Sequence, residues 1–251
     1  MLPIGDEDTG GTAFPFVNLT IIAICVLVFL LQLASPDFTN GYSVVPREIT
    51  TGQDIVGQFP IQLDDGTTAV IDEARGPSPI WLTIFSAMFM HGGWAHIGGN
   101  MLFLFIFGDN VEKAFGHAKY ALFYLISGVV ATYAQILTGP DSILPNLGAS
   151  GAIAGALAGY LVLFPANRVR VLISYFVTTV PAIVMIGLWF VLQFVSGIGS
   201  ITTSAQTGGV AYFAHIGGFI AGLVMALALR PFADRNLGPH TVGYGRGPAF
   251  R

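Results

Sequence analysis

Mostly apolar runs alternate with shorter polar segments along this chain. Six such runs cover residues 16–33, 94–107, 120–137, 150–164, 171–195 and 210–229. A helix that crosses a bilayer needs about 20 predominantly apolar residues. The pattern therefore predicts an all-α polytopic membrane protein, a bundle of six transmembrane helices. A further apolar stretch, residues 81–90, is too short to span and is expected to lead into the second helix.

The domain organisation follows from the same pattern. Residues 1–15 are expected to form an N-terminal segment, residues 16–230 the six-helix membrane domain, and the Gly- and Pro-rich residues 231–251 a flexible tail. The first apolar run is too long for a signal-peptide core and lacks a preceding basic region, so it is interpreted as a retained helix. Residues 35–79, rich in proline and acidic residues, form an extramembrane loop with room for short helices or strands.

Composition excludes several classes of protein. Hydrophobic residues make up 53% of the 251 residues and charged residues 10%, whereas soluble domains carry about 25% charged residues. Basic residues form no large cluster, so no nucleic-acid partner is expected. Cys25 is the single cysteine, which excludes an intrachain disulfide and a cysteine-based metal site. We expect the lipid bilayer as partner, and neither a metal nor an organic cofactor.

The distribution of basic residues orients the predicted bundle. Residues 35–79, on one side of the predicted membrane, contain two of them. The loops on the opposite side and the tail contain eight: Lys113, Lys119, Arg168, Arg170, Arg230, Arg235, Arg246 and Arg251. Because Lys and Arg concentrate in cytoplasmic loops, both termini are predicted to be cytoplasmic. The second, fourth and sixth helices then run from the outer face inward, and their N-terminal ends share one depth.

Polar residues lie at these three helix starts. His96 and Asn100 fall in the first turns of the second helix, Ser150 opens the fourth, and His215 lies early in the sixth. Polar groups at membrane depth are expensive and usually functional. The topology therefore predicts a polar site near the outer leaflet.

These residue types suggest acyl-transfer chemistry. Serine becomes a nucleophile when a neighbouring base removes its proton, and neutral histidine is the usual base. No Asp or Glu occurs in residues 150–164 or 210–229, so Ser150 and His215 are predicted to act as a dyad rather than a triad. The backbone N–H of Ser150 at a helix start, with His96 and Asn100 four residues apart on one helix face, could supply an oxyanion hole.

Small residues predict that the fourth and sixth helices approach closely. Gly148 and Gly151 flank Ser150, Gly151 and Gly155 recur at four-residue spacing, and Gly218 and Gly222 do so in the sixth helix. Such stripes let helix backbones come together. Taken singly, a glycine stripe indicates packing only, and a serine in an apolar helix usually bonds back to a carbonyl one turn earlier. The combination favours catalysis.

The motifs over residues 81–229 resemble those of the rhomboid family of intramembrane serine proteases. They are residues 91–100, the Gly108, Glu112 and Gly116 pattern, the Gly148-Ala149-Ser150-Gly151 run, and His215 with Gly218 and Gly222. The resemblance implies that Ser150 is the nucleophile and that His96 and Asn100 bind the oxyanion. It also implies that His91 is structural near the loop and that Glu112 ties helix ends together on the cytoplasmic side.

The resemblance further implies a six-helix protease without a seventh helix that cleaves single-span transmembrane segments with small residues at the cut. We expect an integral protein of a prokaryotic plasma membrane; the oligomeric state stays open. Two alternatives are a non-catalytic rhomboid-like factor that binds or escorts membrane proteins, and a small-solute transporter. A non-catalytic relative would typically have lost Ser150 or His215, and no internal repeat or pair of broken helices favours a transporter.

Three features of the chain depart from the family pattern or leave its reading open. Ala154 stands where many members carry an aromatic that stacks on the catalytic imidazole, so Tyr212 or Phe213 is expected to orient His215 instead. The long loop has no evident Trp–Arg pair. The fifth helix, over residues 171–195, has no polar catalytic residue, and its aromatics Trp189 and Phe190 form either a lateral gate or an ordinary packing surface.

Overall fold

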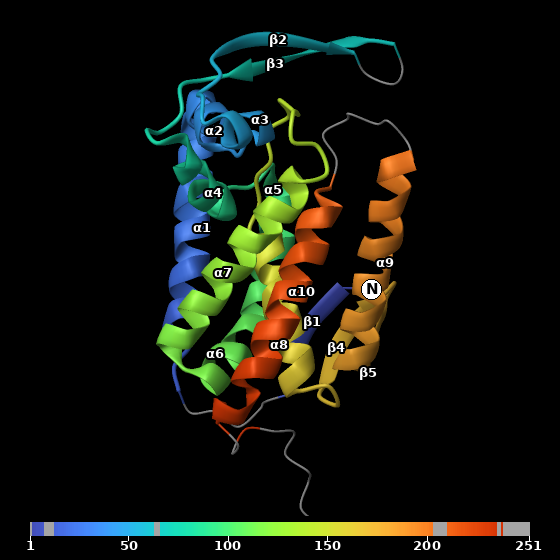
Figure 1. Ribbon diagram of the computed structural model, residues 1–251. Coiled ribbons are helices and arrows are strands. Elements are labelled where there is room, and N and C mark those ends of the chain that lie inside the picture. Colours follow the sequence, from blue (N-terminus) through green and yellow to red (C-terminus); the bar gives the residue numbers. More distant parts are fainter. Residues whose placement is uncertain (1, 8–12, 63–65, 203–209, 235–236, 238–251) are drawn as a thin grey trace, which may run out of the picture.

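The computed structural model describes residues 2–7, 13–62, 66–202, 210–234 and 237 as a helical bundle with two small sheets (Figure 1). Its elements in chain order are β1 (Leu2–Asp6), α1 (Phe16–Ala34), α2 (Pro36–Tyr42), α3 (Pro46–Thr51), β2 (Gly57–Gln62), β3 (Thr68–Glu73), η1 (Ile80–Leu82), α4 (Thr83–Ser86), η2 (Ala87–Phe89), α5 (Trp94–Phe103), the π-helical η3 (Leu104–Gly108), α6 (Asp109–Phe115), α7 (His117–Ile136), α8 (Ser150–Leu163), β4 (Arg168–Ile173), β5 (Phe176–Pro181), α9 (Ala182–Thr202), α10 (Tyr212–Leu229) and η4 (Arg230–Phe232). Most of the predicted tail, beyond residue 234, lies outside the described residues.

Helices occupy each of the six apolar runs, although not always over the predicted bounds. Among the described residues, three are long and apolar enough to cross a membrane: Phe16–Ala34, Ala182–Gly199 and Tyr212–Phe232. The second run forms one helical path, because α5 continues through η3 into α6. The fourth run gives α8, which is apolar but only 14 residues long. The chain is thus mostly helical, with a polytopic membrane character.

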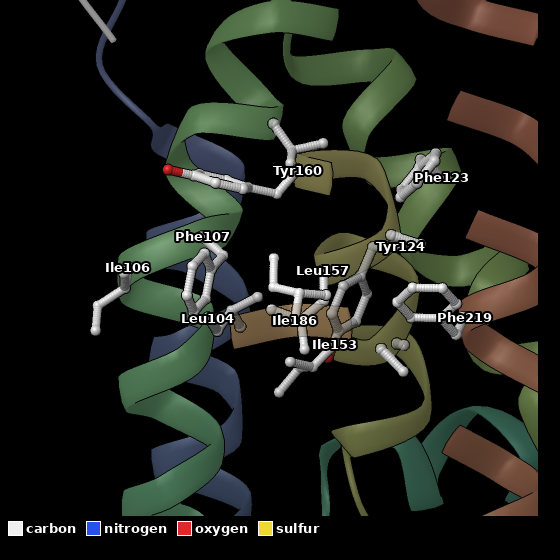
Figure 2. Close-up of a cluster of buried hydrophobic side chains, with 14 of the residues drawn as sticks. Leu104, Ile106, Phe107, Phe123, Tyr124, Ile153, Leu157, Tyr160, Ile186 and Phe219 are labelled. Carbon is white, nitrogen blue, oxygen red and sulfur yellow. The ribbon is translucent and has the colours of Figure 1, made fainter. Parts of the chain in front are cut away.

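The short helix α8 forms the centre of the bundle. Every residue from Gly151 to Tyr160 is buried, as expected of a helix that is apolar on all sides. Its Ile153 and Leu157 belong to one buried cluster with Leu104 of η3 and Phe219 of α10 (Figure 2). Because α8 is surrounded, its first residue is held in a fixed position by the core.

The predicted fifth helix begins too early. Residues 168–181 form the antiparallel hairpin β4–β5, and α9 starts only at Ala182. Arg168 and Arg170 alternate with the buried Val169 and Val171, which is the two-residue period of a strand rather than a helix. Hydropathy alone does not reveal this alternation, so it assigns the stretch to a helix. Pro181, at the end of the hairpin, is a residue that a helix interior would not accommodate.

The N-terminal segment contributes a strand to the same sheet. β1 pairs antiparallel with β4, giving the order β1-β4-β5. The Asp6 Oδ2 atom accepts hydrogen bonds from the Tyr160 hydroxyl at 2.6 Å and from the Asn110 amide at 2.9 Å. Residues 2–7 are therefore joined to α8 and α6 rather than free of the bundle.

The loop over residues 35–79 folds into α2, α3 and the hairpin β2–β3, in agreement with the short elements predicted for it. The hairpin lies across one end of the bundle, which we call the hairpin end (Figure 1). An isolated bridge between Val44 and Asn146 joins this loop to the segment that precedes α8. The loop thus supports the polypeptide that leads into Ser150.

The loop over residues 35–79 contains two buried carboxyl groups. Glu73 at the end of β3 and Glu48 of α3 are 2% and 3% exposed. Glu48 Oε1 accepts a hydrogen bond from the Ile55 amide at 2.8 Å, whereas Glu73 Oε1 has no partner among the described residues. Burial, followed by the charges of Glu48 and Asp72, raises the pKa of Glu73 to about 8. Glu73 is therefore protonated at neutral pH.

This burial predicts a pH-dependent stability of the loop. Because the pKa of Glu73 is higher in the folded than in the unfolded chain, its stabilising effect is complete below about pH 4.5 and is lost as the pH rises through about 8. We expect the free energy of unfolding to fall by roughly 2 kcal/mol between pH 6 and pH 9. Glu73→Gln, which cannot ionise, should remove most of that fall. Thermal unfolding in detergent at both pH values measures the difference, and an equal pH dependence in both proteins would contradict the assignment.

Candidate active site

The helices α8 and α10 approach so closely that their backbones meet at two glycine pairs. A Cβ placed on Gly218 would collide with the Gly151 carbonyl, and one on Gly222 would collide with the backbone of Gly155. No residue larger than glycine fits at either position without moving a helix. The stripe predicted from sequence therefore forms a close helix crossing, of the type that small residues permit.

This crossing brings the predicted nucleophile and base together. Ser150 is the first residue of α8, and His215 lies in the first turn of α10 and is 7% exposed. Their Oγ and Nε2 atoms are 2.7 Å apart, which is hydrogen-bond distance. The start of α10 is held in turn by Gln135 of α7, whose Oε1 accepts the Ala214 N–H at 3.3 Å.

The other side of the imidazole contacts α9. His215 Nδ1 lies 2.7 Å from Oε1 of Gln193, and the Trp189 ring lies 5.7 Å from the imidazole, centroid to centroid. The aromatic ring found against His215 is thus that of Trp189, rather than of Tyr212 or Phe213 as predicted. The fifth helix, expected to have no polar catalytic residue, nevertheless contributes a polar contact to the imidazole through Gln193.

Sequence reasoning missed Gln193 for an identifiable reason. A single amide in an apolar helix carries little weight by itself. Its spacing from Trp189 is the available signal, since residues four apart share one helix face. Phe190, the second predicted gate residue, stacks on Phe219 of α10 with the ring centroids 4.3 Å apart. Both aromatics therefore face α10 in this structure.

A third helix, α5, comes close to the serine through His96, with Gly148 beside both side chains. His96 Nδ1 accepts the Gly92 N–H at 3.2 Å, so a neutral His96 carries its proton on Nε2. A Cβ built on Gly148 would lie 3.2 Å from that Nε2 and 3.5 Å from Ser150 Oγ. Gly148 has φ +141°, and its N–H donates to the Ala87 carbonyl at 2.9 Å. The glycine leaves the space between the His96 ring and Ser150 open.

Asn100 lies one turn after His96 on α5, which packs against α8. Its Nδ2 atom is buried and has no hydrogen-bond partner among the described residues. An unsatisfied buried donor costs about 1–3 kcal/mol. A buried donor without a partner needs an explanation, and a catalytic role is one of those available.

A pocket opens beside Ser150, between α7, α10 and the segment that precedes α8. Apolar side chains dominate its lining, and Thr132, Gln135 and Asn146 supply polar groups. Its other lining residues are Val44, Ala87, Met88, Ile136, Leu147, Gly148, Ala211 and Ala214. The serine hydroxyl is therefore bordered by a largely apolar recess.

Two further predicted residues join elements of the bundle to one another. Glu112 accepts the N–H groups of Val17 and Asn18 at 2.9 and 2.6 Å, at the N-terminal end of α1, and its Oε1 lies 2.5 Å from Nδ1 of His117. Glu112 thereby joins the ends of α6, α1 and α7.

His91 is fixed through its backbone. Its N–H donates to Oε1 of Gln32 at 2.8 Å, and its carbonyl accepts from Nε2 of the same side chain at 3.2 Å. The contact joins the segment before α5 to α1. In the described part of the chain, no group of three or more His, Cys, Asp or Glu side chains could hold a metal ion.

A polytopic helical membrane fold with a serine–histidine pair at a glycine-mediated helix crossing defines a narrow class of proteins. Comparison with known families agrees with this description, because the family model described as Rhomboid domain matches residues 79–232. The chain belongs to the rhomboid family and is an integral membrane protein.

Three relatives illustrate the similarity. The chain is 31% identical to the Rhomboid protease GluP of Bacillus subtilis (strain 168) over 149 residues, which are 59% of this chain and 26% of that protein. It is 31% identical over 146 residues to RHOMBOID-like protein 4 of Arabidopsis thaliana, covering 58% and 33%. It is 29% identical over 182 residues to Rhomboid-type serine protease 2 of Emericella nidulans, covering 71% and 32%. The chain thus spans about a quarter to a third of these relatives' lengths.

Proposed function

We propose that this protein is an intramembrane serine endopeptidase that cleaves transmembrane segments of other membrane proteins. The observation that carries the proposal is the 2.7 Å approach of Ser150 Oγ and His215 Nε2. Relatives named as a rhomboid protease and a rhomboid-type serine protease support the class of reaction.

The proposed mechanism begins with proton transfer from Ser150 to His215. Oγ attacks the substrate carbonyl as His215 Nε2 accepts the hydroxyl proton. The tetrahedral intermediate then breaks its C–N bond, and His215 returns the proton to the leaving amine. His215 then takes a proton from a water molecule that attacks the resulting ester, and it returns this proton to Ser150 Oγ as the bond between Oγ and the acyl carbon breaks. Ser150 therefore supplies the nucleophile, and His215 carries the proton transfers of both halves of the reaction.

Stabilisation of the developing oxyanion is assigned to three donors. The backbone N–H of Ser150 is at the start of α8, where no intrahelical partner is available and the helix dipole favours negative charge. The unpartnered Asn100 Nδ2 and the His96 Nε2 that faces Gly148 are the side-chain donors. Donors that are fixed before the reaction need no reorganisation, so they stabilise the transition state strongly.

The proposed topology has six membrane-crossing helices, both termini in the cytoplasm, and the hairpin end with Ser150 toward the outer face. The distribution of basic residues supports this orientation. A substrate helix would enter sideways from the bilayer, and the apolar recess beside Ser150 suits a small side chain at the cleaved bond. Prokaryotic plasma membrane is the location we propose. A metal or organic cofactor has no part in this mechanism.

The first prediction is that Ser150→Ala abolishes cleavage and leaves the bundle folded, because only a hydroxyl is lost at a helix start. Detergent-purified protein is incubated with a transmembrane reporter, and thermal unfolding provides the folding control. Binding of the reporter without cleavage by the intact protein would favour a non-catalytic escort function. Undiminished turnover in Ser150→Ala would contradict the nucleophile assignment.

Asn100→Ala tests the oxyanion assignment. One such donor is worth about 10²–10³ in rate, so this variant should keep a small residual activity that His215→Ala lacks. Rates of both variants with the same reporter give the ranking. If Asn100→Ala were as inactive as His215→Ala while unfolding at the normal temperature, Asn100 would have a different role.

A further inference from the structure

We propose that Gln193 of α9 is a positioning residue for His215, and that it fixes the tautomer and ring orientation that proton transfer from Ser150 requires. This inference rests on the proposed protease function. On this proposal, α9 contributes to the orientation of the catalytic histidine and does not only pack beside the site.

The hydrogen bonds of the imidazole carry the first step. His215 contacts Ser150 Oγ through Nε2 and Gln193 Oε1 through Nδ1, both at 2.7 Å. A neutral imidazole has one N–H and one lone pair. To accept the serine proton at Nε2, it must carry its own proton on Nδ1. The Gln193 carbonyl oxygen can only accept, so it selects this tautomer.

The same oxygen also serves the charged intermediate. Once His215 has taken the serine proton, both ring nitrogens are donors. Gln193 Oε1 then remains bonded to Nδ1–H, and no reorganisation is needed at that side of the ring. This role is commonly filled by a carboxylate, but neither α8 nor α10 contains Asp or Glu. A neutral amide on a third helix replaces it here.

Trp189 restricts the orientation of the imidazole plane. It lies one turn before Gln193 on the same face of α9, with its ring 5.7 Å from the imidazole and tilted by 39°. It also lies against Phe219, centroid to centroid at 6.5 Å. One helix face thus supplies both the hydrogen bond and the ring contact.

The arrangement has a consequence for substrate entry. The opposite face of α9 is exposed, with Val191 and Leu192 54% and 55% accessible. If α9 moves aside to admit a substrate helix, the Gln193–His215 hydrogen bond breaks. The imidazole is then oriented only when α9 has returned, so cleavage requires the closed position of α9.

Three variants test the proposal. Gln193→Leu keeps the approximate size but has no acceptor, Gln193→Glu keeps acceptor oxygens, and Leu192→Ala is the control on the exposed face of the same turn. The kcat and KM for the transmembrane reporter, the rate of Ser150 labelling by a fluorophosphonate, and the unfolding temperature are measured for each.

We expect Gln193→Leu to lower kcat about 10- to 100-fold, the scale seen when a hydrogen-bond partner of a metal-binding histidine is removed. Its KM should stay within about twofold, its labelling should slow in parallel, and its unfolding temperature should match that of Leu192→Ala. Gln193→Glu should keep kcat within about tenfold of the parent. This rescue also tests the direction of the hydrogen bond, because a carboxylate cannot donate to Nδ1.

Wild-type kcat in Gln193→Leu would overturn the proposal, as would equal losses in the Leu and Glu variants. A loss expressed only as higher KM or lower unfolding temperature would assign Gln193 to packing instead. These outcomes are separate from failure of the protease function, in which the parent protein itself neither cleaves the reporter nor labels at Ser150.

Discussion

The backbone contact between α8 and α10 is the constraint on which the rest of the site depends. Gly218 faces the Gly151 carbonyl and Gly222 faces the Gly155 backbone at distances that exclude any side chain. In a bilayer, where apolar side chains gain little by associating, such close packing is a main source of helix affinity. The same contact sets Ser150 and His215 at 2.7 Å. Packing and the proposed chemistry therefore rest on the same glycines.

The surrounding elements complete what these two helices lack. Gln135 of α7 accepts a free N–H at the start of α10, and the loop before α8 is held by the Gly148 and Asn146 backbone bonds. Asn100 comes from α5, and Gln193 comes from α9. The side chains of Ser150, His215 and Gln193 are paired with one another, and the unpaired Asn100 Nδ2 is the donor that we propose for a reacting carbonyl. That distribution limits the cost of burying polar groups.

Most of the site could be predicted from sequence because topology relates distant residues. Alternating helix directions place the starts of every second helix at one depth, and this brought His96, Ser150 and His215 together without any contact information. The β4–β5 hairpin could not be found by hydropathy, since Val169 and Val171 are as apolar as helix residues. Gln193 was missed because its significance lies in an interhelical hydrogen bond, and the rotation of α9 about its axis is set by packing rather than by composition.

The central claim is that the glycine-mediated approach of α8 and α10 creates an activated serine. It is tested by the rate at which a fluorophosphonate labels Ser150 in Gly218→Ala, with Gly187→Ala as the matched control. A Cβ on Gly218 meets the Gly151 carbonyl, whereas one on Gly187 meets no atom within 4 Å. We expect labelling to be lost or strongly slowed in Gly218→Ala and unchanged in Gly187→Ala. Labelling of Ser150 at the parent rate in Gly218→Ala would contradict the account.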